Sequence, residues 1–292
     1  MSFSIDFMKH RKIFLSISAA IMIGSILLLM TRGLNLGIDF TGGNVIHVEL
    51  SKNERISVGE VREIVGAVLQ GNVMIQEIGD AAFIIRIQED EEDVRNKVFD
   101  ALRSKYADIQ VLGFEKVGPA VGAELRREAL IGLAIALLAI LAYITYRFQF
   151  RFAIVSVLAL IHDSMAVLGA FSLTGMEVNS TFIAAILTIV GYSLNATIII
   201  IDRIRENWKD LASKKIARLV NESTNQTLSR TINTTLTTIF PVIALYIWGG
   251  PVLRSFSFAF LVGLIVGTYS SVCVSTSLIC EWWVRKPLTD KK

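Results

Sequence analysis

Residues 129–146 read ALIGLAIALLAILAYITY, and no charged residue interrupts them. A helix rises about 1.5 Å per residue, so this stretch is long enough to cross a hydrocarbon core of about 30 Å. A helix of a soluble protein rarely stays apolar on every side over such a length. Five more stretches are similar, and only one of them contains charge, at His162–Asp163: 13–30, 152–175, 180–201, 231–250 and 255–280. The sequence therefore predicts a polytopic α-helical membrane protein with six transmembrane helices.

The basic residues lie almost entirely on one side of the predicted helices. Sixteen Lys and Arg residues fall at the two ends of the chain and in segments 147–151 and 202–230, whereas the opposite short turns contain only Arg254. Because basic residues remain on the cytoplasmic side, both termini are predicted to be cytoplasmic. This orientation accounts for the basic loop, so no nucleic-acid partner is predicted. The predicted divisions are a cytoplasmic N-terminus (1–12), transmembrane helix 1 (13–30), an extracytoplasmic domain (31–128), helices 2–6 (within 129–280, with a cytoplasmic loop at 202–230) and a cytoplasmic tail (281–292).

The extracytoplasmic segment is long enough to form one small α+β domain with its own core. Alternating apolar and polar residues predict strands, and apolar residues at helical spacing predict helices, in the order β-α-β-β-α-β: 44–50, 57–70, 72–78, 81–88, 90–106 and 109–117. Ser57 and Glu60 have the spacing of a capping box. The order is typical of the ferredoxin-like split motif. The sequence of this domain has no His/Cys cluster, nucleophile–base pair or phosphate loop, so we expect no enzymatic, metal or cofactor site in it.

Two glycine-rich junctions connect this domain to the predicted helices. The first reads GLNLGIDFTGG (33–43) and the second reads VGPAVGAEL (117–125). Glycine permits positive φ and close approach of backbones, whereas proline fixes φ. The junctions are interpreted either as two simple turns or as a hinge pair on which the domain swings. The candidate hinge residues are Gly37, Asp39, Gly42, Gly43, Gly118, Pro119 and Gly122.

Asp163 lies near the middle of the span 152–175, beside His162. Ionisable residues at bilayer depth are energetically costly and are therefore candidates for function. The pair is interpreted either as a proton relay or as a structural contact with another helix. Adjacent positions on a helix point about 100° apart, which argues against both side chains facing one partner.

Polar residues also recur on one face of spans four and five. They are Asn195 and Asp202 in the first of these spans, and Arg230, Asn233, Thr234 and Thr237 in the second. Two such stripes on neighbouring helices would hold a file of water for proton transfer. Alternatively, they are contacts between helices, worth about 1 kcal/mol each, and Arg230 extends to the cytoplasmic surface.

Span six carries a packing signal. Gly263 and Gly267 have the G-x-x-x-G spacing that lets a neighbouring helix approach closely. The pattern is common by chance, so it leaves open whether the neighbour belongs to the same chain or to a partner.

Six segments occur together in this chain: GIDFTGG (37–43), VGPAVGAEL (117–125), His162–Asp163, GYSLNATIIIIDRIREN (191–207), SRTINTT (229–235) and GGPVLRSFSFAFLVGLIVGTYSS (249–271). In this order they resemble the SecF family of the bacterial protein-export machinery, over nearly the whole chain. The resemblance implies a resistance–nodulation–division-type subunit of the inner membrane that pairs with SecD to complete twelve spans. It also implies a transporter-type function rather than an enzymatic one. The pair would reside in the lipid bilayer and use the proton gradient to help draw preproteins out of the SecYEG channel. Sodium is the alternative coupling ion, and no cofactor is expected.

One position departs from the family pattern. In SecF an aspartate follows the asparagine that corresponds to Asn195, in the sequence N-D-T, and that aspartate is taken as the proton carrier, whereas this chain has Ala196. Alanine neither binds a proton nor pairs with Arg230. Either the relay is silenced here, or Asp163, Asp202 or an aspartate of SecD carries the proton. The resemblance still favours the position of Asn195, Ala196 and Arg230 as the relay site.

Two other functions are compatible with the sequence. The first is a structural scaffold without proton coupling, which Ala196 favours. The second is half of a small-molecule or lipid exporter. One outer domain of 98 residues leaves little room for the large cavity that such an exporter requires.

Overall fold

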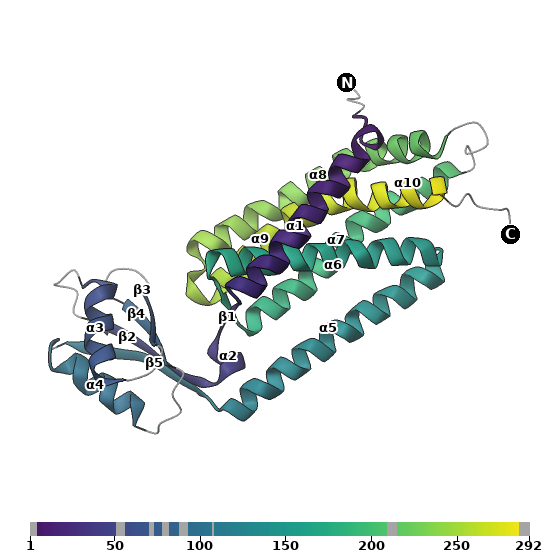
Figure 1. Ribbon diagram of the computed structural model, residues 1–292. Helices are drawn as coiled ribbons and strands as arrows, with labels where there is room; N and C mark the ends of the chain where they lie inside the picture. The colour runs from purple at the N-terminus through teal and green to yellow at the C-terminus, as the bar shows by residue number, and fades with distance from the viewer. Residues whose placement is uncertain are drawn as a thin grey trace. The chain divides into compact units, whose positions relative to one another are not determined.

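The computed structural model describes residues 5–50, 56–69, 73–77, 82–87, 93–106, 108–208 and 215–285. The chain divides into two compact units, whose elements are labelled in Figure 1. The membrane unit comprises Met1–Asn35, Gly132–Met176 and Thr181–Lys292, and the outer unit comprises Leu36–Ile131 and Glu177–Ser180. The outer unit therefore includes a short turn that the sequence places between two spans.

The described part of the outer unit contains a four-stranded antiparallel sheet, whose strands lie in the order β3–β4–β2–β5. Its elements are β2 (Gly43–Leu50), α3 (Val58–Val68), β3 (Val73–Glu77), β4 (Ala82–Ile87), α4 (Val94–Arg103) and β5 (Ile109–Val117). The chain order and the strand order together confirm the predicted ferredoxin-like motif. In the register, Ile46 of β2 pairs with Ile85 of β4 and with Phe114 of β5. Ser57 and Glu60 form the predicted capping box at the start of α3.

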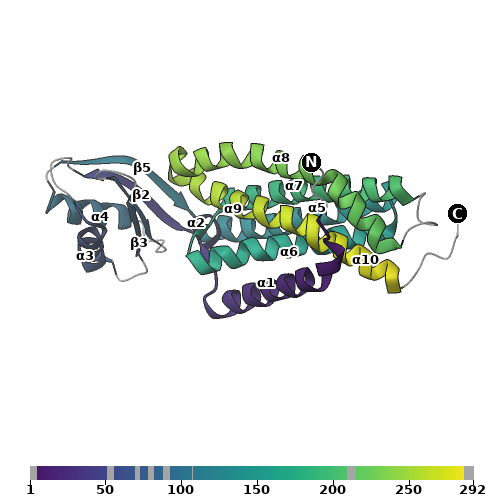
Figure 2. The ribbon, with the colours of Figure 1, turned by 90° about the horizontal axis from the view of Figure 1, so that it is seen from above.

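α3 and α4 cover one face of the four-stranded sheet of the outer unit (Figure 2). Val61 and Val65 of α3 and Val98 and Leu102 of α4 are fully buried there, in one core with Ile46. Burying a side chain of this size contributes roughly 1.5–3 kcal/mol. Because these residues recur at helical spacing, the periodicity of the sequence determines which face of each helix packs on the sheet. The outer unit also contains α2 (Ile38–Thr41) and β6 (Glu177–Val178), and β1 (Asn35–Leu36) lies at its start.

Among the described residues, six helices are long and apolar enough to cross a membrane, which confirms the predicted class. The short 3-10 turn η1 (Met8–His10) precedes the first of them. The helices are α1 (Arg11–Thr31), α5 (Pro119–Arg147), α6 (Phe150–Thr174), α7 (Ser180–Asn207), α8 (Ile216–Trp248), and a last span made of α9 (Gly250–Tyr269), the π-helical turn η3 (Ser270–Ser275) and α10 (Thr276–Arg285). α1 packs along α6, and α8 packs along α9 (Figures 1 and 2).

Several helices extend beyond the apolar stretches that predicted them, and α7 continues to Asn207 rather than ending at residue 201. α5 begins at Pro119 rather than at residue 129, and α8 begins at Ile216 rather than at residue 231. The segment 202–230, predicted as a loop, is therefore helical at both ends, while residues 209–214 lie outside the described part. Hydropathy marks only the apolar length of a helix, whereas a helix continues wherever one of its faces is packed. Leu219 and Val220 provide such a face because they are buried in one cluster with Ile201.

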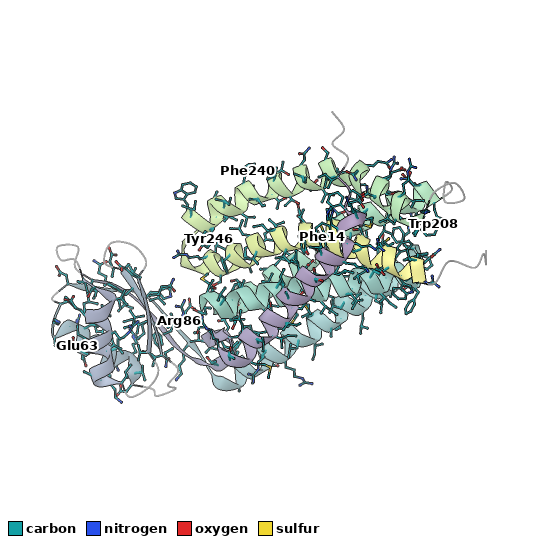
Figure 3. All side chains as sticks on the ribbon, turned by 45° about the horizontal axis from the view of Figure 1, so that its top comes forward. Phe14, Glu63, Arg86, Trp208, Phe240 and Tyr246 are labelled. Carbon is teal, nitrogen blue, oxygen red and sulfur yellow. The ribbon has the colours of Figure 1, made fainter. Side chains whose placement is uncertain are left out.

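Large apolar side chains cover the outside of the membrane unit. Phe240 of α8 is 66% exposed and points away from the neighbouring helices (Figure 3), and Leu138 of α5 is 65% exposed. Exposed apolar surface on this scale is unfavourable in water and fits a lipid environment. α5 is the least buried of the six described spans. Only 6% of its 18-residue apolar stretch is buried, compared with 61% of the corresponding stretch of α6.

Candidate functional site

The carboxylate of Asp163 joins three helical elements of the membrane unit. Asp163 lies on α6 and is 0% exposed. Its Oδ2 accepts hydrogen bonds from Ser193 Oγ of α7 at 2.6 Å and from Ser270 Oγ of η3 at 2.8 Å. Its Oδ1 lies 3.1 Å from Nδ1 of His162. Burying a carboxylate without such partners would be strongly unfavourable, so these contacts explain how Asp163 is accommodated.

The imidazole of His162 has one nitrogen without a partner. Nδ1 contacts Asp163, whereas Nε2 is buried and has no hydrogen-bond partner among the described residues. Buried polar atoms are nearly always paired, so an unpaired one suggests a functional position. The ring centroid of His162 lies 6.3 Å from that of Tyr269. Although adjacent positions diverge on a helix, the side chains of His162 and Asp163 contact each other.

The π-helical turn η3 places serine side chains against α6 and α7. Ser271 Oγ lies 2.9 Å from Thr197 Oγ1 and donates to the backbone oxygen of Ser193 at 3.2 Å. Ser275 Oγ donates to the backbone oxygen of Ser270 at 3.0 Å. π turns within helices occur frequently at functional sites. Sequence analysis missed Ser193 and Ser270, because the only signal of their role is a hydroxyl in an apolar span.

The G-x-x-x-G pair of the last span packs within the chain. A Cβ at Gly267 would lie 3.1 Å from Cβ of Ser193 and 3.5 Å from Oδ2 of Asp163. A Cβ at Gly263 would overlap the side chain of Ile189. Both glycines therefore let α9 approach α7 closely, and Gly267 borders the buried carboxylate.

The relay position that the resemblance implies, at Asn195, Ala196 and Arg230, does not join this network. Ala196 is 9% exposed on the packed side of α7, whereas Asn195 and Arg230 are exposed. In the described part of the chain, neither the Asn195 amide nor the Arg230 guanidinium has a hydrogen-bond partner. Asp202 is half-buried near the end of α7, and its carboxylate is also unpaired among those residues. The structure thus connects Asp163 and His162 to neighbouring helices and leaves the other candidates outside.

Two segments that are far apart in the sequence, 37–39 and 178–180, meet in the outer unit. The backbone N–H of Gly37 donates to the backbone oxygen of Val178 at 2.8 Å. The backbone N–H of Ser180, the first residue of α7, donates to Oδ2 of Asp39 at 2.7 Å. A carboxylate at a helix N-terminus is favourable because it faces free N–H groups and the positive end of the helix dipole. Asp39 therefore acts as a cap for α7.

The junction glycines are required for different reasons. Gly42 and Gly43 have φ of +73° and +137°, which a side chain would strain. Gly118 and Gly122 do not have positive φ, so close approach of backbones is the remaining reason for glycine that the sequence analysis offered. Instead, a Cβ at Gly122 would lie 3.0 Å from the backbone nitrogen of Gly42 and 3.1 Å from the backbone carbon of Phe40. Pro119 is the first residue of α5, where proline is favoured.

An ion pair that sequence analysis missed lies beside the first junction. Nε of Arg86, on β4 (Figure 3), lies 2.9 Å from Oε2 of Glu177, and the two side chains are 16% and 13% exposed. Burial raises the pKa of Glu177, Arg86 lowers it, and Asp39 raises it, with a net increase. The partners are far apart in the sequence, so no local pattern points to the pair. Among the described residues, no group of three or more His, Cys, Asp and Glu side chains could hold a metal ion.

Comparisons with known proteins find two matching families. The family described as "Protein export membrane protein SecD/SecF, C-terminal" matches residues 97–285, and "SecD/SecF GG Motif" matches residues 27–54. The chain belongs to the SecF family. Its relative in Calditerrivibrio nitroreducens, Protein translocase subunit SecF, is 41% identical over 285 residues, which cover 94% of this chain and 93% of that protein. Protein translocase subunit SecDF of Thermus thermophilus is 41% identical over 260 residues, which cover 87% of this chain but 35% of that longer protein.

Solved structures of SecDF have the same fold as this SecF-family chain. The crystal structure of Thermus thermophilus SecDF, described as a translocon-associated membrane protein, has a TM-score of 0.88 at 37% identity and covers 97% of this chain. A structure of SecDF in a super-membrane-facing form has a TM-score of 0.74 at 38% identity and covers 98%. This chain spans 39% and 40% of those two chains.

Proposed function

We propose that this chain is the SecF half of a two-part machine that assists preprotein export across the bacterial inner membrane. A SecD-type partner would supply six further spans, and the preprotein would emerge from the SecYEG channel. The observation that carries this proposal is that the chain matches one part of a longer SecDF protein and nearly all of proteins called SecF. Those names favour a translocase subunit over a small-molecule exporter.

The exposed polar surface of α7 and α8 is the proposed contact with the partner. Asn195 of α7 and Arg230, Asn233, Thr234 and Thr237 of α8 are exposed. Polar groups at membrane depth normally face other protein rather than lipid, because lipid offers them no hydrogen bonds. A partner helix with a carboxylate would satisfy Arg230 and would supply a charge that Ala196 lacks.

The proposed proton carrier within this chain is Asp163, assisted by His162. An ionised carboxylate accepts stronger hydrogen bonds than a neutral one, by about twofold. Protonation of Asp163 would therefore weaken its hold on Ser193 and Ser270, which belong to α7 and η3. Proton binding would in this way weaken the hydrogen bonds between α6 and its neighbours α7 and η3. Coupling proton transfer to a movement of the helices requires such a change.

The proposed orientation places both termini and the connection between α7 and α8 in the cytoplasm, with the outer unit on the opposite side. The distribution of basic residues supports it. A membrane-impermeant thiol reagent added from outside should label Glu63→Cys and spare Arg218→Cys, and the reverse result would overturn the orientation.

Preprotein translocation into vesicles from cells without their own SecD and SecF tests the function. We expect this chain to stimulate translocation only together with a SecD-type partner and only while a proton gradient is present. Stimulation that persists after the gradient is dissipated would favour the second candidate, a scaffold without proton coupling, which Ala196 supports. No stimulation under any condition would contradict both.

A further inference from the structure

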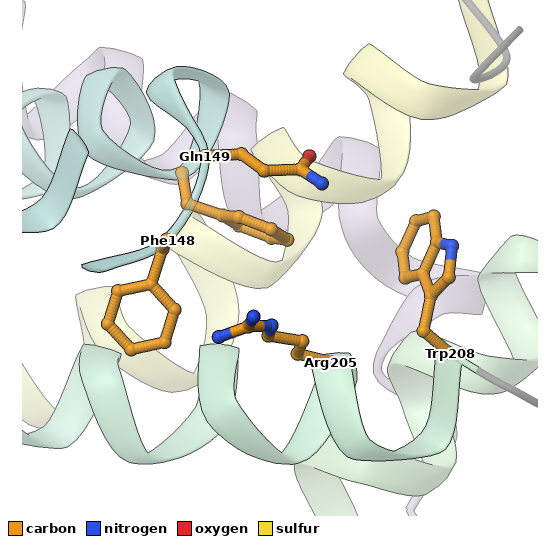
Figure 4. A pocket seen from close by; sticks show the side chains of 5 residues that line it. Phe148, Gln149, Arg205 and Trp208 are labelled. Carbon is orange, nitrogen blue, oxygen red and sulfur yellow. The ribbon is translucent and has the colours of Figure 1, made fainter. Parts of the chain in front are cut away.

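A cavity of about 310 Å³ lies in the membrane unit, between the α5–α6 turn and the end of α7. Five side chains line it (Figure 4): Phe148, Gln149, Phe152, Arg205 and Trp208. The first three belong to the turn between α5 and α6 and to the start of α6. Arg205 lies in the last turn of α7, and Trp208 directly follows that helix. The lining therefore combines aromatic rings with one guanidinium and one amide, and it contains no carboxylate.

Positive charge gathers around this cavity. The guanidinium carbons of Arg205 and Arg147 lie 6.0 Å and 5.3 Å from the centre of the Phe148 ring. The guanidinium carbon of Arg151 lies 5.6 Å from the ring of Trp283, which is itself 5.9 Å from the ring of Trp208. Arg205 is exposed, and in the described part of the chain it forms no ion pair. Arginine is well suited to hold a phosphate because its planar fork donates two parallel hydrogen bonds.

The cavity lies at the edge of the apolar spans. Tyr146 and Phe150 flank the α5–α6 turn and are 92% and 58% exposed. Both are amphipathic or apolar side chains at the end of a membrane-crossing helix, where aromatic residues face lipid headgroups. These exposed aromatic side chains favour a position of the cavity mouth at the headgroup region of a bilayer.

We propose that this cavity binds the phosphodiester headgroup of an anionic phospholipid. Arg205 would hold the phosphate, the Gln149 amide would donate to it, and the rings of Phe148, Phe152 and Trp208 would contact the glycerol and the start of the acyl chains. Basic pockets between transmembrane helices bind such headgroups on the side where anionic lipids attract basic residues. The bound lipid would bridge the α5–α6 turn to the end of α7, and so fasten α5, the least packed of the described spans.

Native mass spectrometry of the full chain in detergent, titrated with phosphatidylglycerol or with phosphatidylcholine, tests this proposal. We expect the unmodified chain to retain phosphatidylglycerol in preference to the zwitterionic lipid. Arg205→Gln should weaken phosphatidylglycerol binding by about fivefold, equivalent to roughly 1 kcal/mol. The affinity of Arg205→Lys for this lipid should lie between those of the unmodified chain and of Arg205→Gln.

Arg218→Gln is the matched control, because it removes the same charge from an exposed ion pair with Glu222 away from the cavity. It should leave lipid retention unchanged. Equal retention of the two lipids by the unmodified chain, or equal weakening by Arg205→Gln and Arg218→Gln, would overturn the proposal. Retention that is unaffected by Arg205→Gln would overturn it as well.

Discussion

Asp163 of α6 accepts a 2.8 Å hydrogen bond from Ser270, the first residue of the π-helical turn in the last span. A second hydroxyl, that of Ser193 on α7, donates to the same oxygen at 2.6 Å. One carboxylate therefore fastens α6 to two other spans, and its protonation would loosen both contacts together. This relationship connects the fold of the membrane unit to the proposed coupling of protons.

Loss of the Ser270 hydroxyl should destabilise the membrane unit. Ser270→Ala removes one of the two hydroxyl donors to a buried carboxylate oxygen, and an unsatisfied buried acceptor costs about 1–3 kcal/mol. Ser257→Ala is the control, because the Ser257 hydroxyl is also buried but has no partner among the described residues. Thermal unfolding in detergent should show a lower midpoint for Ser270→Ala and little change for Ser257→Ala. Equal effects of the two substitutions would contradict the assignment.

Gly263 should tolerate a side chain only if Ile189 is shortened. A Cβ at Gly263 overlaps the Ile189 side chain on α7, and overpacking of this kind costs roughly 1–3 kcal/mol. We expect Gly263→Ala to lower the unfolding temperature and Ile189→Ala to recover part of the loss in the double variant. If the two effects simply add, then the residues do not share this contact.

A side chain at the junction should slow export without preventing folding. In Gly122→Ala, the new methyl group would press on the backbone at Phe40 and Gly42, whereas Gly132→Ala lies on the same helix with open space around it. We expect slower translocation for Gly122→Ala and a normal rate for Gly132→Ala, with both proteins accumulating in the membrane. The more disruptive Gly43→Pro and Gly122→Pro should slow it further. Normal translocation in all of them would remove the hinge hypothesis.

The Glu177 carboxyl should make stability depend on pH. Burial raises its pKa in the folded chain above the ordinary value of 4.5, despite the opposing effect of Arg86. The contribution of Glu177 to the free energy of unfolding is therefore fully present below its pKa in the unfolded chain. It is lost as the pH rises through its pKa in the folded chain. As the pH rises from 4.5 through the raised pKa of the folded chain, the unfolding temperature should fall more for the unmodified chain than for Glu177→Gln. Glu63→Gln, at an exposed position of the outer unit, should behave like the unmodified chain; identical pH profiles for all three would refute this role.

The fold was largely predictable because its signals are local. The apolar length of each span and the alternation in strands such as Gly43–Leu50 are properties of consecutive residues. Helix ends were less predictable, since Ile216 begins a helix whose polar first half is held by packing against other spans.

The site was predictable only in part. Asp163 stands out as a carboxylate inside an apolar stretch, but its partners Ser193 and Ser270 do not, because serine is common in membrane helices. Arg86 and Glu177 come from two segments that are far apart in the sequence and lie together in the outer unit. Their spacing in the sequence therefore does not predict the ion pair.

The alternative relay on α7 makes a separate prediction. Ala196→Asp places a carboxylate on the packed side of the helix, at the position that the resemblance assigned to the relay. If this position is the relay, then the substitution should increase proton-gradient-dependent export, and adding Arg230→Leu should abolish the increase. The effects should be strongly non-additive, because the two side chains would act as a unit.

Proton-gradient-dependent translocation by Asp163→Asn, measured in vesicles with a SecD-type partner present, tests the central claim most directly. Asparagine keeps the size of the side chain but cannot carry the proton. Asp100→Asn, at an exposed position of α4, is the matched control. We predict that Asp163→Asn loses the gradient-dependent part of export while accumulating normally in the membrane, and that Asp100→Asn retains it. Full gradient dependence in Asp163→Asn, together with a response to Ala196→Asp, would contradict this account and move the relay to α7.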